Sequence, residues 1–68
     1  MNKNKLYYEM RERNVTVSEL CDAINMSRSA FYRKCNGKSE FTLSEARAIV
    51  EYLGLDDPME IFFDEEVS

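Results

Sequence analysis

Apolar residues recur along the chain at the three- and four-residue spacing of amphipathic helices, and no stretch keeps the alternation of a strand. This spacing predicts five short helices. Their expected ranges are residues 3–13, 17–24, 28–35, 43–53 and 58–63. The pattern therefore predicts an all-α fold, built as one compact five-helix domain.

Residues that start or stop helices stand at several of these boundaries. Thr16 with Glu19, and Thr42 with Glu45, have the spacing of capping boxes, in which both side chains accept hydrogen bonds from otherwise unpaired amides. Gly54 is the expected end of the fourth helix. The apolar stripe that should face the core from that helix consists of Leu43, Ala46, Ile49, Val50 and Leu53.

The third predicted helix is capped by Ser27 and follows the second after a break of only Asn25 and Met26. Successive residues of a helix are rotated by about 100°, which separates two arcs. One arc is polar and holds Arg28, Ser29, Tyr32, Arg33 and Asn36. The opposite arc holds Ala30, Phe31, Lys34 and Cys35. This helix should therefore be anchored through Phe31 and expose a base-rich face.

Length and composition exclude several classes of protein. With 68 residues, 44% of them hydrophobic, the chain suits one folded domain, which is too small to hold a large substrate cavity without losing stability. The absence of histidine excludes common zinc sites and histidine-based catalysis. Cys21 and Cys35 are expected to be core thiols rather than redox or metal-binding groups. No enzymatic function, cofactor, metal or small-molecule substrate is expected.

The chain lacks a signal-peptide pattern and any apolar run long enough to span a membrane, so a cytoplasmic location is expected. The net charge of −4 hides a strong segregation. Residues 27–38 carry four basic side chains and no acid, whereas residues 39–68 carry nine acids and only Arg47 as a base. A polyanion responds to the local electrostatic potential of the face that it approaches. For binding to a polyanion, the basic segment therefore matters more than the net charge of the whole chain.

A helix of this kind fits the DNA major groove, where arginine can grip guanine with two hydrogen bonds and hydroxyl groups can serve several base edges. The candidate base-reading residues are Arg28, Ser29, Tyr32 and Arg33. Helix amino ends and turn amides suit phosphate oxygens. The candidate phosphate-binding residues are Thr16, Val17, Ser18, Ser27, Asn36, Gly37 and Lys38. The alternative for these side chains is an ordinary solvated helix surface.

The end of the chain carries adjacent aromatic residues. Asp57 and Pro58 are expected to open the fifth helix, with the aspartate as its cap. Phe62 and Phe63 lie about 100° apart on a helix, so both cannot easily enter one small core and one ring should be partly exposed. Residues 64–68 form an acidic tail that is expected to be frayed.

Between residues 17 and 38 the chain has a leucine inside a helix, a small residue after it, a tight turn, a serine cap and a closing Asn-Gly-Lys turn. This order resembles the phage-repressor/Cro-like, or XRE-type, helix-turn-helix family. The matching residues are Leu20, Cys21, Ile24, Ser27, Phe31 and Asn36-Gly37-Lys38. The resemblance implies a lambda-repressor-like DNA-binding domain over residues 1–63, with the helix-turn-helix unit at residues 17–35.

Some residues depart from the family pattern. Asn25 replaces the usual turn glycine, which is tolerable because asparagine adopts positive φ more readily than most residues. Met10 and Cys35 stand where many members have a buried Arg–Glu pair, and such an exchange can be neutral for stability. Lys34 stands where a core leucine is usual, so only its methylene stem is expected to be covered.

The resemblance implies a sequence-specific regulator of transcription, of phage or prophage type, that binds double-stranded DNA. It further implies a homodimer on a near-palindromic operator, with repression by occlusion. The family pairs through the end that carries Phe62 and Phe63, which makes both candidate dimer-interface residues. The competing function is a protein-interaction module, such as an antirepressor or antitoxin partner.

Overall fold

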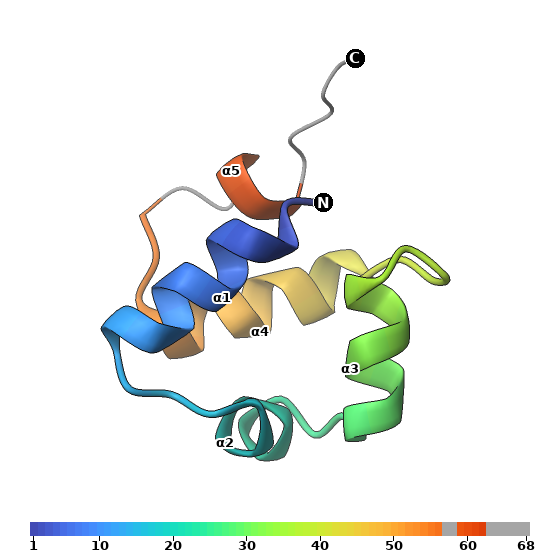
Figure 1. The fold of residues 1–68 in the computed structure, drawn as a ribbon, viewed down its shortest axis with the longest axis horizontal. Helices are drawn as coiled ribbons and strands as arrows, with labels where there is room; N and C mark the ends of the chain where they lie inside the picture. The colour runs from blue at the N-terminus through green and yellow to red at the C-terminus, as the bar shows by residue number, and fades with distance from the viewer. Residues whose placement is uncertain (57–58, 63–68) are drawn as a thin grey trace.

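The computed structural model describes residues 1–56 and 59–62, and the described residues form an all-helical fold without strands (Figure 1). The elements are α1 (Lys3–Glu12), α2 (Val17–Ala23), α3 (Arg28–Cys35), α4 (Leu43–Leu53) and α5 (Met59–Phe62). The predicted all-α class is confirmed. Of the expected fifth helix, α5 is a single turn, and the predicted opening at Asp57 and Pro58 lies outside the described residues.

The starts of the helices are fixed by local hydrogen bonds. In the capping box of α2, Thr16 Oγ1 accepts from the Glu19 amide at 3.0 Å and Glu19 Oε1 accepts from the Thr16 amide at 2.9 Å. Thr42 and Glu45 repeat this exchange at α4, over 3.1 and 2.9 Å. Both predicted capping boxes are thus confirmed, as is Ser27 as the cap of α3.

The ends of the helices use the left-handed backbone region. Asn14 after α1 and Asn25 after α2 have φ values of 57° and 59°. Gly37 and Gly54 have φ values of 84° and 72°. Asparagine and glycine adopt this conformation at lower cost than other residues. Asn25 therefore takes the place of the expected turn glycine in the way the sequence predicts.

The core lies between the helices and is built around Phe31, whose side chain is fully buried. Other buried side chains in the same cluster come from every described helix: Leu6, Met10, Leu20, Cys21, Cys35, Ile49, Leu53 and Ile61. Figure 1 shows α1 lying across α4, with α2 and α3 on the other side of the fold from α5. The core therefore joins the α2–α3 unit to the rest of the domain.

The two ends of the described chain are also joined. The Asn2 amide donates to the Ile61 carbonyl at 2.7 Å, and α5 packs against α1 beside the N-terminus (Figure 1).

The prediction that Leu43 faces the core was wrong, because its side chain is 65% exposed. The rest of the α4 stripe is buried at Ala46, Ile49 and Leu53 and half-buried at Val50. On a helix with 100° per residue, Leu43 lies roughly 90° from the centre of the buried arc. It is also the first residue of α4. Its position at the edge of the stripe and at the helix end leaves it in solvent.

Phe31→Ala tests the anchoring of α3, and Tyr32→Ala is a matched control on the same helix. Phe31 is 0% exposed and Tyr32 is 45% exposed. Removal of a buried phenylalanine ring should lower the free energy of unfolding by about 3–5 kcal/mol. Truncation of Tyr32, whose ring meets that of Phe31 edge to face at 5.9 Å, should cost less, about 0.5–1.5 kcal/mol. Denaturant unfolding of both variants measures the difference, and equal losses would contradict the anchoring role of Phe31.

Candidate nucleic-acid interface

Helix α3 separates its side chains into a core face and a solvent face. Phe31 and Cys35 are buried, and Ala30 and Lys34 are half-buried. The solvent face carries all four predicted base-reading residues, which are exposed: Arg28, Ser29, Tyr32 and Arg33. The helix therefore presents two guanidinium groups and two hydroxyl groups outward on a rigid support.

The two arginines of α3 remain available to a ligand. Among the side chains that the structure describes, which are those of residues 1–56, 61 and 62, no carboxylate forms an ion pair with Arg28 or Arg33. Arg28 Nη1 instead donates to Ser18 Oγ at 3.1 Å. This bond joins a predicted base-reading residue to a predicted phosphate-binding residue, and it places the first turns of α2 and α3 beside each other.

The predicted phosphate-binding residues fall into three places. Thr16, Val17 and Ser18 begin α2, Ser27 begins α3, and the third group follows α3: Asn36, Gly37 and Lys38. All are exposed except Val17, which is half-buried against the core. The first amides of a helix have no acceptor within it. The caps accept the Glu19 and Ala30 amides, and the amides before these in the first turns of α2 and α3 are left, together with the positive dipole end, to face a ligand.

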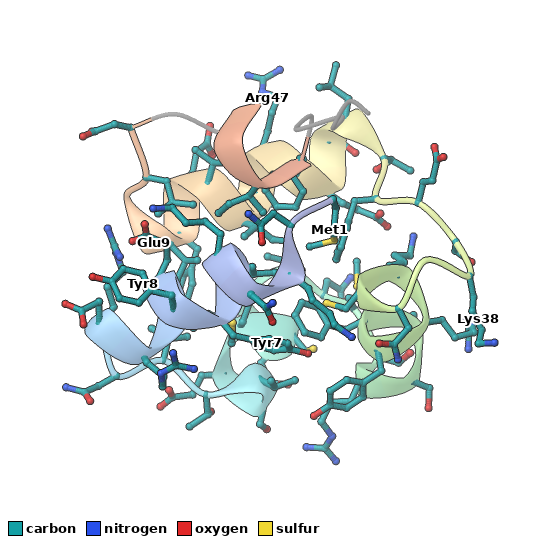
Figure 2. All side chains as sticks on the ribbon, turned by 45° about the horizontal axis from the view of Figure 1, so that its top comes forward. Met1, Tyr7, Tyr8, Glu9, Lys38 and Arg47 are labelled. Atoms are coloured by element: carbon teal, nitrogen blue, oxygen red, sulfur yellow. The ribbon has the colours of Figure 1, made fainter. Side chains whose placement is uncertain are left out.

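The turn after α3 is closed by its own backbone. The Gly37 amide donates to the Lys34 carbonyl at 3.2 Å, and the Lys38 amide donates to the Arg33 carbonyl at 2.9 Å. Positive φ at Gly37 makes this geometry possible. Figure 2 shows Lys38 pointing away from the loop, where it can reach a ligand beside α3.

Lys3 is a basic residue of this region that sequence reasoning missed. Its Nζ donates to Asn36 Oδ1 at 2.9 Å, although 33 residues separate the two in the chain. The bond brings an exposed ammonium from the start of α1 to the end of α3. No local pattern could have indicated it, because the contact depends on how α1 packs against the rest of the fold.

Lys34 differs from the expectation that only its stem would be covered. Its Nζ lies 2.9 Å from Glu45 Oε1, and the two side chains are only 16% and 28% exposed. The hydrogen bond from Lys34 lowers the pKa of the Glu45 carboxyl, with a smaller contribution from the Thr42 backbone amide. The position of a core leucine is thus filled by a half-buried ion pair that ties α3 to α4.

Both cysteines lie in the core as free thiols. Burial raises the pKa of the Cys21 thiol and that of the Cys35 thiol. Burial, together with the neighbouring Cys35 sulfur, raises the pKa of Tyr7 to about 12. The neutral forms are favoured, in agreement with a packing role. Among the described side chains of residues 1–56, 61 and 62, no three acidic, cysteine or histidine groups are arranged to bind a metal ion.

The candidate dimer-interface residues are only partly described. Phe62 is half-buried and packs edge to face on Phe41, with 5.4 Å between the ring centroids. Phe63 lies outside the described residues. Phe62 and Phe41 line an open groove of about 580 Å³ beside the N-terminus and the α3–α4 loop.

None of the helices in the described part of the chain is long and apolar enough to cross a membrane.

Helix α2, a short turn and α3 together form a helix-turn-helix whose second helix exposes a polar, basic face. The chain belongs to the family of Cro/C1-type helix-turn-helix DNA-binding domains, whose sequence model matches residues 5–65. It is therefore a DNA-binding regulator whose ligand is double-stranded DNA, and the family is typically not enzymatic. No curated protein and no solved structure gives a significant match to the chain.

Glu45 should make the stability depend on pH. A carboxyl whose pKa is lowered in the folded state stabilises the fold above its unfolded pKa, and this stabilisation is lost as the pH falls through the lowered value. Glu45→Gln removes the titrating group and, since glutamine also serves in a capping box, keeps the helix start. Chemical unfolding from about pH 7 to about pH 3 should show the two stabilities converging. A constant difference would contradict the role of the ion pair.

Proposed function

We propose that the chain is a sequence-specific transcriptional repressor of phage or prophage type, which binds a near-palindromic operator as a homodimer. The observation that carries this proposal is the solvent face of α3. Four side chains able to read bases share it, and both of its arginines are free of carboxylate partners in the described part of the chain.

Specificity would come from the first turns of α3. An arginine can donate two parallel hydrogen bonds to O6 and N7 of guanine in the major groove. Arg28 is held toward Ser18, at the end of α3 that enters the groove in helix-turn-helix proteins. Ser29, Tyr32 and Arg33 continue the same exposed face and would read neighbouring bases.

Affinity would come from contacts to phosphates on both sides of α3. The exposed first turns of α2 and α3 lie on one side, and the Asn36-Gly37-Lys38 turn lies at the other end. These contacts carry no sequence information but set the register of the helix on the duplex. The acids of residues 39–68 would keep the opposite end of the domain away from DNA.

A homodimer would place two copies of α3 in successive major grooves, about 34 Å apart. Phe62 and Phe63 are the proposed interface residues, as the resemblance implies, and the half-buried Phe62 leaves part of its ring open to a partner. A dimer spanning two grooves would repress by denying polymerase access to the occupied DNA.

Arg28→Ala and Lys38→Ala should separate base reading from phosphate binding. Loss of Arg28 should cost about 1–3 kcal/mol on the selected site and relax the sequence preference, while random duplex loses less. Loss of Lys38 should weaken all duplexes alike and reduce the slope of log K against log salt by about 0.9. Fluorescence anisotropy at several salt concentrations measures both. Equal losses for Arg28→Ala on specific and random DNA would contradict base reading.

Selection of bound oligonucleotides from a random duplex pool tests the dimer and the operator together. Two inverted half-sites with centres about 10 base pairs apart should be enriched. Enrichment of a single half-site would contradict the homodimer. A wild-type protein that binds no duplex even at low salt would contradict DNA binding and favour the protein-interaction module.

A further inference from the structure

Lys34 touches the α3–α4 loop at both of the loop's ends. Its backbone carbonyl accepts a hydrogen bond from the Gly37 amide at 3.2 Å, at the start of the loop. Its side-chain ammonium lies 3.4 Å from the Glu40 carbonyl, near the end of the loop. Lys38, the candidate phosphate-binding residue, lies between these two attachments.

The ammonium of Lys34 is itself fixed from the α4 side. Glu45 Oε1 lies 2.9 Å from Lys34 Nζ and also accepts the Thr42 amide at 2.9 Å. The capping box of α4 holds the Glu45 carboxylate in place, so the carboxylate restricts the position of the Lys34 ammonium. A charge held in this way positions its partner.

The Phe41 ring also lies beside the Lys34 ammonium. Its Nζ lies 6.0 Å from the centroid of the Phe41 ring, within the range of a cation–π interaction. Phe41 packs edge to face on Phe31 at 5.9 Å and on Phe62 at 5.4 Å. The loop that follows the C-terminal end of α3 is thus tied, through Phe41, to the Phe31 ring that anchors α3.

We propose that Lys34 is a positioning residue for DNA binding: through Glu45 and the Glu40 carbonyl it holds the α3–α4 loop in the shape that presents Lys38 to a phosphate. The inference rests on the proposed function. It deepens that function by giving the half-buried Lys34–Glu45 pair a role that a core leucine could not perform. A leucine would fill the space but could hold neither the carbonyl nor the carboxylate.

The competing role for Lys34 is direct contact with a phosphate, and the two roles predict opposite effects of Glu45→Gln. If Lys34 bound phosphate, loss of the Glu45 charge would free it and strengthen DNA binding. If Lys34 acts through Glu45, the same change loosens the loop and weakens binding. Glutamine still suits the capping box, so the start of α4 is retained in either case.

The experiment compares Lys34→Met, Glu45→Gln and the double variant, with Glu51→Gln as the control for charge. Glu51 lies on α4 as Glu45 does, it is exposed, and it has no lysine or arginine partner among the described residues. Its substitution therefore measures the effect of removing one negative charge from α4 without changing a capping box or a candidate phosphate-binding residue. Affinities for the selected duplex and for random duplex are measured by anisotropy, and circular dichroism confirms that each variant is folded.

Lys34→Met should weaken binding to both duplexes by about two- to tenfold, the cost of ordering a loop segment on binding. Glu45→Gln should weaken it by less, and the double variant should be no worse than Lys34→Met. Amide hydrogen exchange of the free protein adds a readout that a phosphate contact would leave unchanged. Protection at Gly37 and Lys38 should fall in Lys34→Met and in Glu45→Gln.

The inference is overturned if Glu45→Gln binds DNA as tightly as Glu51→Gln does, or if amide protection at Gly37 and Lys38 matches the wild type in both variants. The proposed function fails in a different way, through a wild-type protein that binds no duplex. In that event, the amide-exchange comparison still decides whether Lys34 holds the loop.

Discussion

Burial of the Phe31 ring is the interaction on which the rest of the structure depends. It fixes the rotation of α3, so that Arg28, Ser29, Tyr32 and Arg33 face solvent, and it contacts Phe41, which supports the following loop. A domain of this size has few other large buried side chains that could hold α3 against the core. The same ring that closes the core therefore orients the face that is proposed to meet DNA.

The surface beside α3 is assembled from parts that are distant in sequence. Ser18 reaches Arg28 from α2, Lys3 reaches Asn36 from α1, and Glu45 reaches Lys34 from α4. Each of these bonds ends on α3 or on the residue that follows it. Helix α3 is thus supported by polar contacts from three other helices in addition to its apolar anchor, and these contacts limit how far the side chains that form them can move.

The features predictable from sequence were those set by local chemistry. The capping boxes at Thr16 and Thr42 and the positive φ of Asn25 depend on residues a few positions apart, and the exposed arc of α3 follows from helical periodicity. The Lys3–Asn36 and Lys34–Glu45 contacts depend on packing between helices, which periodicity does not specify. Leu43 was wrongly assigned to the core because apolar periodicity predicts which side of a helix faces the core but not how far along the helix the core extends. The resemblance supplied the family, and DNA contact by individual residues stays a prediction.

Chemical protection of bound DNA tests most directly whether α3 lies in the major groove. Dimethyl sulfate methylates guanine at N7, which faces the major groove, and adenine at N3, which faces the minor groove. On the selected duplex, the wild-type protein should protect guanine N7 in two patches separated by one helical turn, and Arg28→Ala should lose part of that protection. Full occupancy with guanine N7 still reactive, or with adenine N3 alone protected, would contradict the account.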